Sequence, residues 1–160
     1  MHASAVLVGA RAVLIRGPSG AGKSRLALEL IQAARTGSLP FAKLVGDDRV
    51  HLQAAGGRLL VRPAEALAGL IEVRGIGILR VPHEPCAVVG LVVDLGGDAE
   101  RLPEAGRRQA ELDGVKIPRL AVAAGEAALS AVLALLTFST EPFGLPEYAV
   151  IGTKSGHAEL

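Results

Sequence analysis

The chain has 160 residues, the size of one ordinary domain, and a chain of this length buries roughly two-thirds of its unfolded surface around one core. Its 17 Lys and Arg residues nearly balance its 16 Asp and Glu residues, so the formal net charge of +1 gives no electrostatic footprint for a nucleic acid or an anionic membrane. Half of the residues are hydrophobic but only 2% are aromatic, so Val, Leu, Ile and Ala must fill the core, which favours packing of sheet and helix.

The first third of the chain predicts the order strand, strand, loop, helix. Residues 6–8 and 12–15 are β-rich runs, and the link at 9–11 contains a glycine that suits a hairpin turn. The second run leads directly into the glycine-rich segment 17–24. Apolar residues then recur at helical spacing until Gly37, which predicts a helix that begins near Lys23.

The rest of the chain predicts further strands and one helix. We expect a short strand at 42–45, a hairpin of 50–52 with 59–61, a buried strand at 88–95 and a strand at 117–122. The segment 70–79 mixes charges, apolar residues and glycines, which is unusual for a plain strand. We interpret 98–113 as an exposed loop or irregular helix and 127–138 as a buried helix. We assign a catalytic domain to residues 1–140 and a flexible tail to 141–160.

Two observations favour a cytoplasmic protein. Cys86 is the only cysteine, which excludes an internal disulfide and suits a reducing compartment, and no secretory signal is recognisable. The longest apolar stretch, Ala127 to Phe138, is too short to span the roughly 30 Å hydrocarbon layer of a bilayer. We therefore expect neither a membrane nor a nucleic acid as a partner.

The segment GPSGAGKS has the spacing of a phosphate-binding loop. In such loops the backbone N–H groups surround the phosphates, the lysine reaches the β and γ oxygens, and the hydroxyl contacts Mg²⁺. A β-branched strand before the loop and an amphipathic helix after it supply the structural context that the motif requires. The sequence therefore predicts that ATP and Mg²⁺ bind here. The predicted nucleotide-binding residues are Gly17, Pro18, Ser19, Gly20, Ala21, Gly22, Lys23 and Ser24.

Two further groups of charged residues are candidates for chemistry. Asp47 and Asp48 follow a short apolar strand, so one carboxylate could bind metal through water and the other could accept a proton from an attacking hydroxyl. A solvated turn is the alternative. Glu72 and Arg74 alternate with apolar residues and therefore lie on one face of any strand there, where a surface ion pair is the alternative.

These segments together resemble one known family. His2, the loop GPSGAGKS, the sequence VGDD at Val45 to Asp48 and the sequence IEVRGIGIL at Ile71 to Leu79 are similar to the catalytic domain of HPr kinase/phosphorylase. The resemblance implies an enzyme that phosphorylates a seryl hydroxyl of the phosphocarrier HPr and removes that phosphate by phosphorolysis. It also implies an α/β fold, the phosphoenolpyruvate-carboxykinase-like P-loop fold with a mixed, partly antiparallel sheet, and a homohexamer.

The resemblance implies a role for each matching residue. Lys23 would hold the transferred phosphoryl group, and Asp48 would accept the serine proton in one direction and return it in the other. Arg74 would neutralise charge on the phosphoryl oxygens, and His2 would orient or tune Asp48. The implied metal-binding residues are Ser24, Asp47 and Glu72.

The chain departs from the family pattern in three places. Family members of full length carry an additional N-terminal domain, so we expect a short form with the catalytic half alone. The stretch 36–41 resembles an insertion, and Glu126 stands where the family carries an arginine before its last helix. Two other functions therefore remain open: a small-molecule kinase on the same loop, and a nucleotide-sensing module without catalysis.

Overall fold

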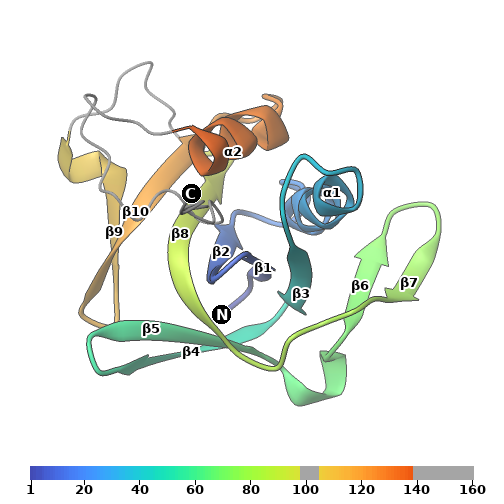
Figure 1. The fold of residues 1–160 in the computed structure, drawn as a ribbon, viewed down its shortest axis with the longest axis horizontal. Helices are drawn as coiled ribbons and strands as arrows, with labels where there is room; N and C mark the ends of the chain where they lie inside the picture. The colour runs from blue at the N-terminus through green and yellow to red at the C-terminus, as the bar shows by residue number, and fades with distance from the viewer. Residues whose placement is uncertain (98–104, 139–160) are drawn as a thin grey trace, which may run out of the picture.

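A computed structural model describes residues 1–97 and 105–138 of the chain. Its central element is an eight-stranded sheet in which the order β3-β1-β2-β8-β10-β9 forms one path, and β5 joins the β4–β5 hairpin to β8 (Figure 1). The strands of this sheet are β1 (Ser4–Val8), β2 (Arg11–Arg16), β3 (Ala42–Gly46), β4 (Val50–Ala55), β5 (Arg58–Pro63), β8 (Ala87–Leu95), β9 (Gln109–Leu112) and β10 (Val115–Val122).

The first hairpin forms where the sequence predicts it. β1 and β2 pair in antiparallel register around Gly9, whose φ of 60° belongs to the left-handed region that favours glycine. β3 pairs with the other edge of β1, also in antiparallel orientation. Most side chains of β1 and β2 are buried, so this hairpin lies inside the molecule and carries the following loop on a rigid support.

The middle of the sheet is parallel. β8 pairs in parallel with β2 on one side and with β10 on the other, while its first residues pair in antiparallel orientation with β5. Eight of the nine residues of β8 are apolar or glycine, as expected of a strand that is covered on both faces. The predicted mixed, partly antiparallel sheet is therefore confirmed.

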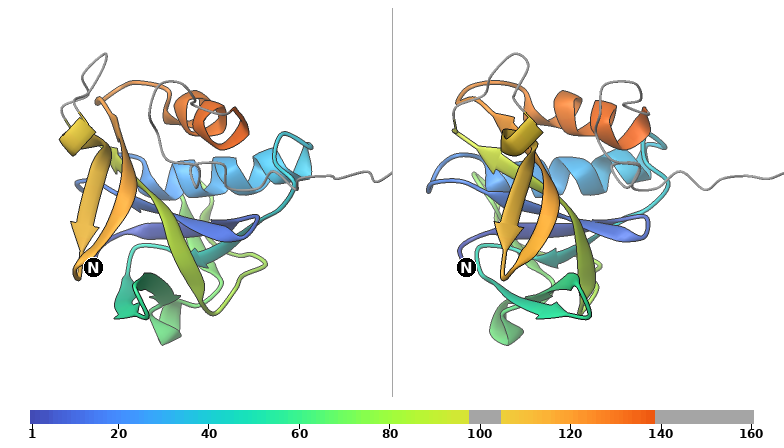
Figure 2. Two further views of the ribbon diagram at one scale, coloured as in Figure 1. Left: turned by 60° about the vertical axis from the view of Figure 1, so that its left-hand side comes forward. Right: turned by 90° about the vertical axis from the view of Figure 1, so that its left-hand side faces the viewer.

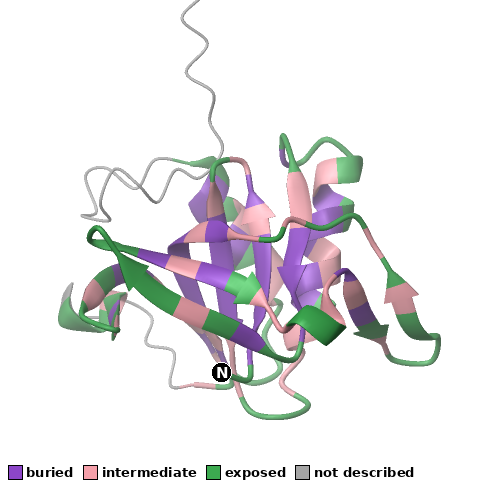
Figure 3. Cartoon of the chain, turned by 90° about the horizontal axis from the view of Figure 1, so that it is seen from below, coloured by how far each residue is buried: buried purple, intermediate pink, exposed green. Residues whose placement is uncertain are grey.

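The two described helices cover one face of the sheet (Figure 2). They are α1 (Lys23–Arg35) and α2 (Ala128–Thr137). Leu26, Leu30 and Leu136 are buried between these helices and the strands, in the larger of two hydrophobic clusters. The second cluster lies on the other face, beneath the β4–β5 hairpin. In Figure 3, buried residues lie on the central strands, and exposed residues lie along much of the β4–β5 hairpin. None of the described helices is long and apolar enough to cross a membrane.

The segment 70–79 is a hairpin rather than a plain strand. β6 (Leu70–Val73) and β7 (Gly77–Arg80) pair only with each other and project from the body next to α1 (Figure 1). Gly75 and Gly77 have φ values of 83° and 110°, and a Cβ on either would meet no atom within 4 Å. These glycines therefore serve the turn. Ile71 packs against the core, whereas Ile76 and Ile78 are 69% and 70% exposed.

The interpretation of 98–113 as loop or irregular helix is partly wrong. Residues 105–108 form a short 3₁₀ helix, but Gln109–Leu112 is strand β9, which pairs in antiparallel orientation with β10. A second short 3₁₀ turn covers Glu65–Leu67. Residues 98–104, and the predicted tail at 141–160, lie outside the described part of the chain.

Candidate functional site

The loop Gly17–Ser24 joins the carboxyl end of β2 to the first turn of α1. Gly20 and Gly22 adopt φ values of 79° and 95°, which only glycine reaches without strain. The N–H of Ala21 donates to the carbonyl of Pro18 at 3.1 Å and closes a tight turn. No side chain caps the amino end of α1 in the described structure. A helix start of this kind presents N–H groups and the positive end of the helix dipole to an anion.

The side chain of Lys23 folds back over the loop. Its Nζ donates to the carbonyl oxygens of Gly17 at 2.8 Å and Pro18 at 3.1 Å. An ammonium has three donors, so one N–H remains for a further acceptor. The arrangement keeps a positive charge over the loop, where the sequence places the phosphates.

Asp47 is the buried centre of the site. Its carboxylate is in contact with Ser24, whose Oγ lies 2.8 Å from Oδ1 and 2.9 Å from Oδ2. The Ser4 hydroxyl donates to Oδ1 at 2.6 Å, and the Glu72 backbone N–H donates to Oδ2 at 3.3 Å. Asp47 is only 3% exposed. Strands β1, β3 and β6 and helix α1 therefore meet at one carboxylate. Asp47 and Ser24, two of the three predicted metal-binding residues, are in contact.

The oxygen donors at this point fit Mg²⁺. This ion binds proteins through one or two carboxylates, keeps several waters and takes the remaining oxygens from the substrate's phosphates. The Ser24 hydroxyl and the Asp47 carboxylate supply donors of that class at the start of α1. The carboxylate of the third predicted metal ligand, Glu72, is exposed and makes no described contact, although its backbone N–H binds Asp47. Among the described residues, no three His, Cys, Asp or Glu side chains converge as a metal cluster.

His2 and Asp48 form a second pair beside Asp47. His2 Nδ1 lies 3.9 Å from Asp48 Oδ1, and both side chains are open to solvent, with 72% and 73% exposure. Asp48 has a φ of 63°, in the left-handed region, which Asp tolerates better than most residues. The turn therefore sends Asp47 inward to Ser24 and leaves Asp48 accessible, which separates the two carboxylates into different environments.

Two other residues singled out by the sequence lie apart from these contacts. Arg74 is exposed in the turn of the β6–β7 hairpin and makes no ion pair with any described residue. Glu126 is exposed in the turn before α2, where its N–H donates to the carbonyl of Ala123 at 3.2 Å. Within the described part of the chain, neither side chain makes a hydrogen bond or an ion pair with the loop.

Sequence reasoning missed a group of three charged residues behind the loop. Arg16 binds Asp94 through two hydrogen bonds of 2.7 and 2.8 Å, and Arg119 binds the same carboxylate through Nε. Burial alone would raise the pKa of Asp94, but hydrogen bonds from Arg16 and Arg119 outweigh it and hold this pKa below its ordinary value. One signal was available: an acidic residue inside the apolar run 88–95 requires a partner.

Comparison with known proteins shows the family of the chain. The family model described as the HPr serine kinase C-terminal domain matches residues 1–84. The HPr kinase/phosphorylase of Streptococcus equinus is 38% identical over 123 residues, which are 69% of this chain and 37% of that protein. The Streptococcus thermophilus (strain ATCC BAA-491 / LMD-9) protein of the same name is 36% identical over 134 residues, 76% of this chain and 41% of the relative. The chain thus spans about two-fifths of these relatives.

A solved structure has the same fold. The HPr(Ser) kinase/phosphatase from Coxiella burnetii superposes with a TM-score of 0.69 and 24% sequence identity, over 85% of this chain and 92% of that one. The predicted fold, which was inferred from the resemblance to HPr kinase/phosphorylase, is confirmed by this likeness.

Proposed function

The chain belongs to the family of the HPr serine kinase C-terminal domain, and on that premise we propose that it is an ATP-dependent protein-serine kinase that acts on an HPr-like phosphocarrier. The contact between Ser24 and Asp47 carries the proposal. It joins the last residue of a phosphate-binding loop to a buried carboxylate, and the next residue along the chain, Asp48, is an accessible carboxylate. A metal-binding oxygen pair and a base beside one phosphate loop are the parts that phosphoryl transfer requires.

Mg²⁺ would be held by Ser24 and Asp47, with Glu72 as a further ligand, and when bound it would offset the negative charge of the nucleotide's β- and γ-phosphates. The protein's own contribution begins with Lys23. Its ammonium lies over the loop and supplies a point charge to the same oxygens. Backbone N–H groups at the start of α1 orient the phosphates and fix the direction in which the terminal group can leave.

Asp48 is the general base in this proposal. It takes the proton of the acceptor's seryl hydroxyl as the serine oxygen bonds to the γ-phosphorus and the bond from phosphorus to the β–γ bridging oxygen breaks, leaving ADP. In phosphorolysis, an oxygen of inorganic phosphate bonds to the phosphorus of phosphoserine and the bond from phosphorus to the serine oxygen breaks. Asp48 passes a proton from the attacking phosphate to that serine oxygen, and pyrophosphate is released. His2, 3.9 Å from Asp48, orients that carboxylate, and Arg74 neutralises charge on the phosphoryl oxygens.

The openness of the base supports a protein acceptor over a small metabolite. Asp48 and His2 are both more than two-thirds exposed. A kinase for a small molecule encloses its substrate in a pocket. An exposed base instead suits an acceptor that brings its own surface to exclude water from the reacting atoms.

Glu126 favours a second candidate function, a nucleotide-sensing module. A carboxylate occupies the position where the resemblance expects an arginine, and arginines that act on transferred phosphates are worth roughly 10³-fold or more in rate. A module that binds nucleotide and signals through contacts would tolerate this change. Asp48→Asn separates the two functions, because a sensor keeps signalling after that substitution while an enzyme stops turning over.

Assembly and location are part of the same proposal. We infer a homohexamer in the cytoplasm, from the resemblance of the chain to HPr kinase/phosphorylase and from its single cysteine. Size-exclusion chromatography with light scattering measures the first of these.

The test is transfer of labelled phosphate. Wild-type protein, γ-labelled ATP, Mg²⁺ and an HPr-like protein are expected to give phosphoserine on the acceptor. Asp48→Asn is expected to keep nucleotide affinity and to lose transfer by about 10²- to 10⁴-fold, the usual contribution of a general base. Asn also tolerates the left-handed φ of residue 48, so the backbone is preserved. Transfer at the wild-type rate by Asp48→Asn would refute the assignment.

A further inference from the structure

Three charged residues from three neighbouring strands form a cluster behind the phosphate loop. Arg16 ends β2, Asp94 lies near the end of β8, and Arg119 lies in β10, and these strands are parallel neighbours. Arg16 grips the carboxylate of Asp94 with Nε and Nη2, a paired geometry that fixes both side chains. Arg119 adds Nε on the same carboxylate and donates from Nη1 to the carbonyl of Arg107 at 3.1 Å.

The cluster is far less solvated than an ordinary surface ion pair. The side chains of Arg16, Asp94 and Arg119 are 27%, 16% and 24% exposed. Partly buried pairs are weakly screened by salt, and their geometry is set by packing, unlike that of exposed pairs. Two guanidinium groups share one carboxylate, so the cluster carries one surplus positive charge next to a site built for anions.

The end of β8 packs against the start of the phosphate loop. A Cβ on Gly17 would lie 2.8 Å from the carbonyl oxygen of Leu95, and a Cβ on Gly96 would lie 3.6 Å from Cδ of Pro18. The residue after Asp94 thus touches the first glycine of the loop, and the residue before that glycine is Arg16. The carbonyl of Gly17 in turn holds the ammonium of Lys23 at 2.8 Å.

These contacts form one chain from the cluster to the phosphate-binding lysine. Asp94 holds Arg16, Arg16 is bonded to Gly17, and Gly17 holds Lys23. Misplacement of a binding group by about 1 Å can cost a hundredfold in rate. A carboxylate that locks the residue just before the loop therefore affects every N–H and the ammonium that follow it.

We propose that Asp94 is a positioning residue for the phosphate-binding loop, which acts through Arg16 to fix where the loop leaves the sheet. The expected effect of Asp94 on nucleotide binding rests on the function proposed above. Its expected effect on the position of the loop does not depend on that function. The substrate class concerned is the nucleoside triphosphate. The reacting atoms are not touched by Asp94, so its loss weakens the hold on nucleotide more than it slows the chemical step.

The first test is hydrogen exchange of the loop in the protein without nucleotide. Asp94→Asn keeps the shape of the side chain but removes the charge that Arg16 and Arg119 share. We expect the amides of residues 17 and 19–24 to exchange about tenfold faster or more in this variant. Two variants serve as controls. Glu84→Gln breaks the ion pair with Lys43, which lies away from the loop, and Leu136→Ala destabilises the core beneath α2. In both controls, exchange of the loop amides is expected to change only as much as the free energy of global unfolding predicts.

A mutant cycle then tests the route through Arg16. Arg16→Gln is expected to reproduce the faster exchange, and the double variant Arg16→Gln/Asp94→Asn is expected to add little, because both substitutions break one linkage. Additive effects would overturn the proposal, and so would unchanged loop exchange in Asp94→Asn.

Titration of MgATP distinguishes this proposal from the function on which it rests. If wild-type protein binds MgATP, Asp94→Asn is expected to raise its Kd about tenfold with a smaller change in kcat. An unchanged Kd would overturn the positioning role. Failure of the wild type to bind MgATP would refute the proposed function, while the exchange experiment would still decide the role of Asp94 in the loop.

Discussion

Ser24 and Asp47, 23 residues apart in sequence, share one hydroxyl hydrogen between the Oγ of the first and both carboxylate oxygens of the second, at 2.8 and 2.9 Å. This contact ties the first turn of α1 to the chain segment that follows β3. It also holds Asp47 inward, so that its neighbour Asp48 faces solvent. One turn therefore supplies a buried carboxylate, the proposed metal ligand, and an accessible carboxylate, the proposed base.

Substitution of Asp47 tests its structural share of this arrangement. Asp47→Ala leaves the hydroxyl of Ser4, which is fully buried, without its acceptor, and an unsatisfied buried group costs about 1–3 kcal/mol. Urea unfolding monitored by circular dichroism measures the loss. Ser4→Ala in the same background removes the orphaned hydroxyl and is expected to restore part of the stability. A double variant no more stable than Asp47→Ala would show that Ser4 is not the source.

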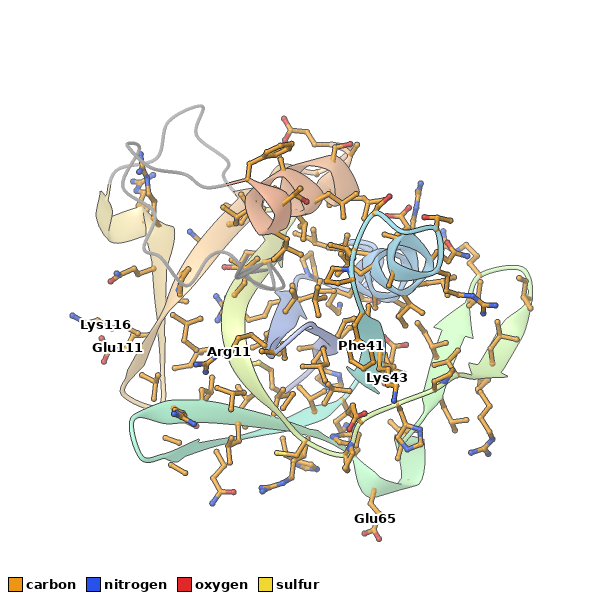
Figure 4. The ribbon with its side chains drawn as sticks, viewed as in Figure 1. Arg11, Phe41, Lys43, Glu65, Glu111 and Lys116 are labelled. Carbon is orange, nitrogen blue, oxygen red and sulfur yellow. The ribbon has the colours of Figure 1, made fainter. Side chains whose placement is uncertain are left out.

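Lys23 is expected to be required for phosphoryl transfer from the bound nucleotide. Lys23→Ala removes the ammonium that folds over the loop and should lower phosphoryl transfer by at least about a hundredfold, the scale of losing one charge-stabilising donor. The rate of transfer is measured with ATP labelled in its γ-phosphate, as the label that appears on acceptor protein retained on a filter. Lys43→Ala is the matched control, since Lys43 pairs with Glu84 and lies 5.2 Å over the ring of Phe41 (Figure 4). Full labelling by Lys23→Ala would contradict the site.

Acid should reveal the Asp94 cluster through stability. The pKa of Asp94 is lower in the folded protein than the ordinary value of 3.8, so the folded state favours the charged form. Its stabilising contribution is complete above that value and is lost as pH falls through the folded pKa. The difference in unfolding free energy between wild type and Asp94→Asn is therefore expected to be constant from neutral pH down to about 3.8 and to shrink below it. A difference that grows on acidification would contradict this linkage.

Position 126 tests the missing cation. Glu126 lies in an exposed turn before α2, so Glu126→Arg is expected to fold normally. If a cation at this position stabilises the transferred phosphoryl group, phosphorolysis of the phosphorylated acceptor should rise by tenfold or more. Release of pyrophosphate is the readout, and Glu126→Gln controls for simple loss of the negative charge. Equal rates in all three proteins would leave the position without mechanistic meaning.

The parts of the fold that were predicted correctly have strong local signals. The loop between β2 and α1 follows from a fixed motif with a β-branched run before it and helical periodicity after it. Strand β9 has no such signal, because only Ala110 of its four residues is buried and its conformation depends on pairing with β10. Tertiary pairing determined that element, and local propensity did not.

The candidate site likewise has residues whose neighbours could be predicted from the sequence and residues whose neighbours could not. A position of Asp47 near Ser24 could be anticipated, because Ser24 belongs to the loop motif and Asp47 follows a short apolar strand and matches the Asp-Asp pair of the resembling family. The partners of Ser4 and Asp94 could not be anticipated. Each is one polar residue in an apolar strand, which signals the need for a partner, but Asp47 and Arg16 lie 43 and 78 residues away in sequence. The role of the Glu72 carboxylate as a metal ligand stays a prediction. In the described structure the backbone N–H of Glu72 donates to Asp47, while its side chain is exposed to solvent.

The parallel pairing of β2 with β8 sets an order of events during synthesis. Arg16 and Asp94 are 78 residues apart, so the glycine-rich segment and its helix leave the ribosome long before the strand that supports them. Contacts this distant in sequence form slowly, because the intervening chain must be closed into a loop first. A nascent chain arrested before residue 87 would contain the whole nucleotide-binding motif but not strand β8, which supports it. The ability to bind a triphosphate would therefore arise only as the second half of the polypeptide emerges.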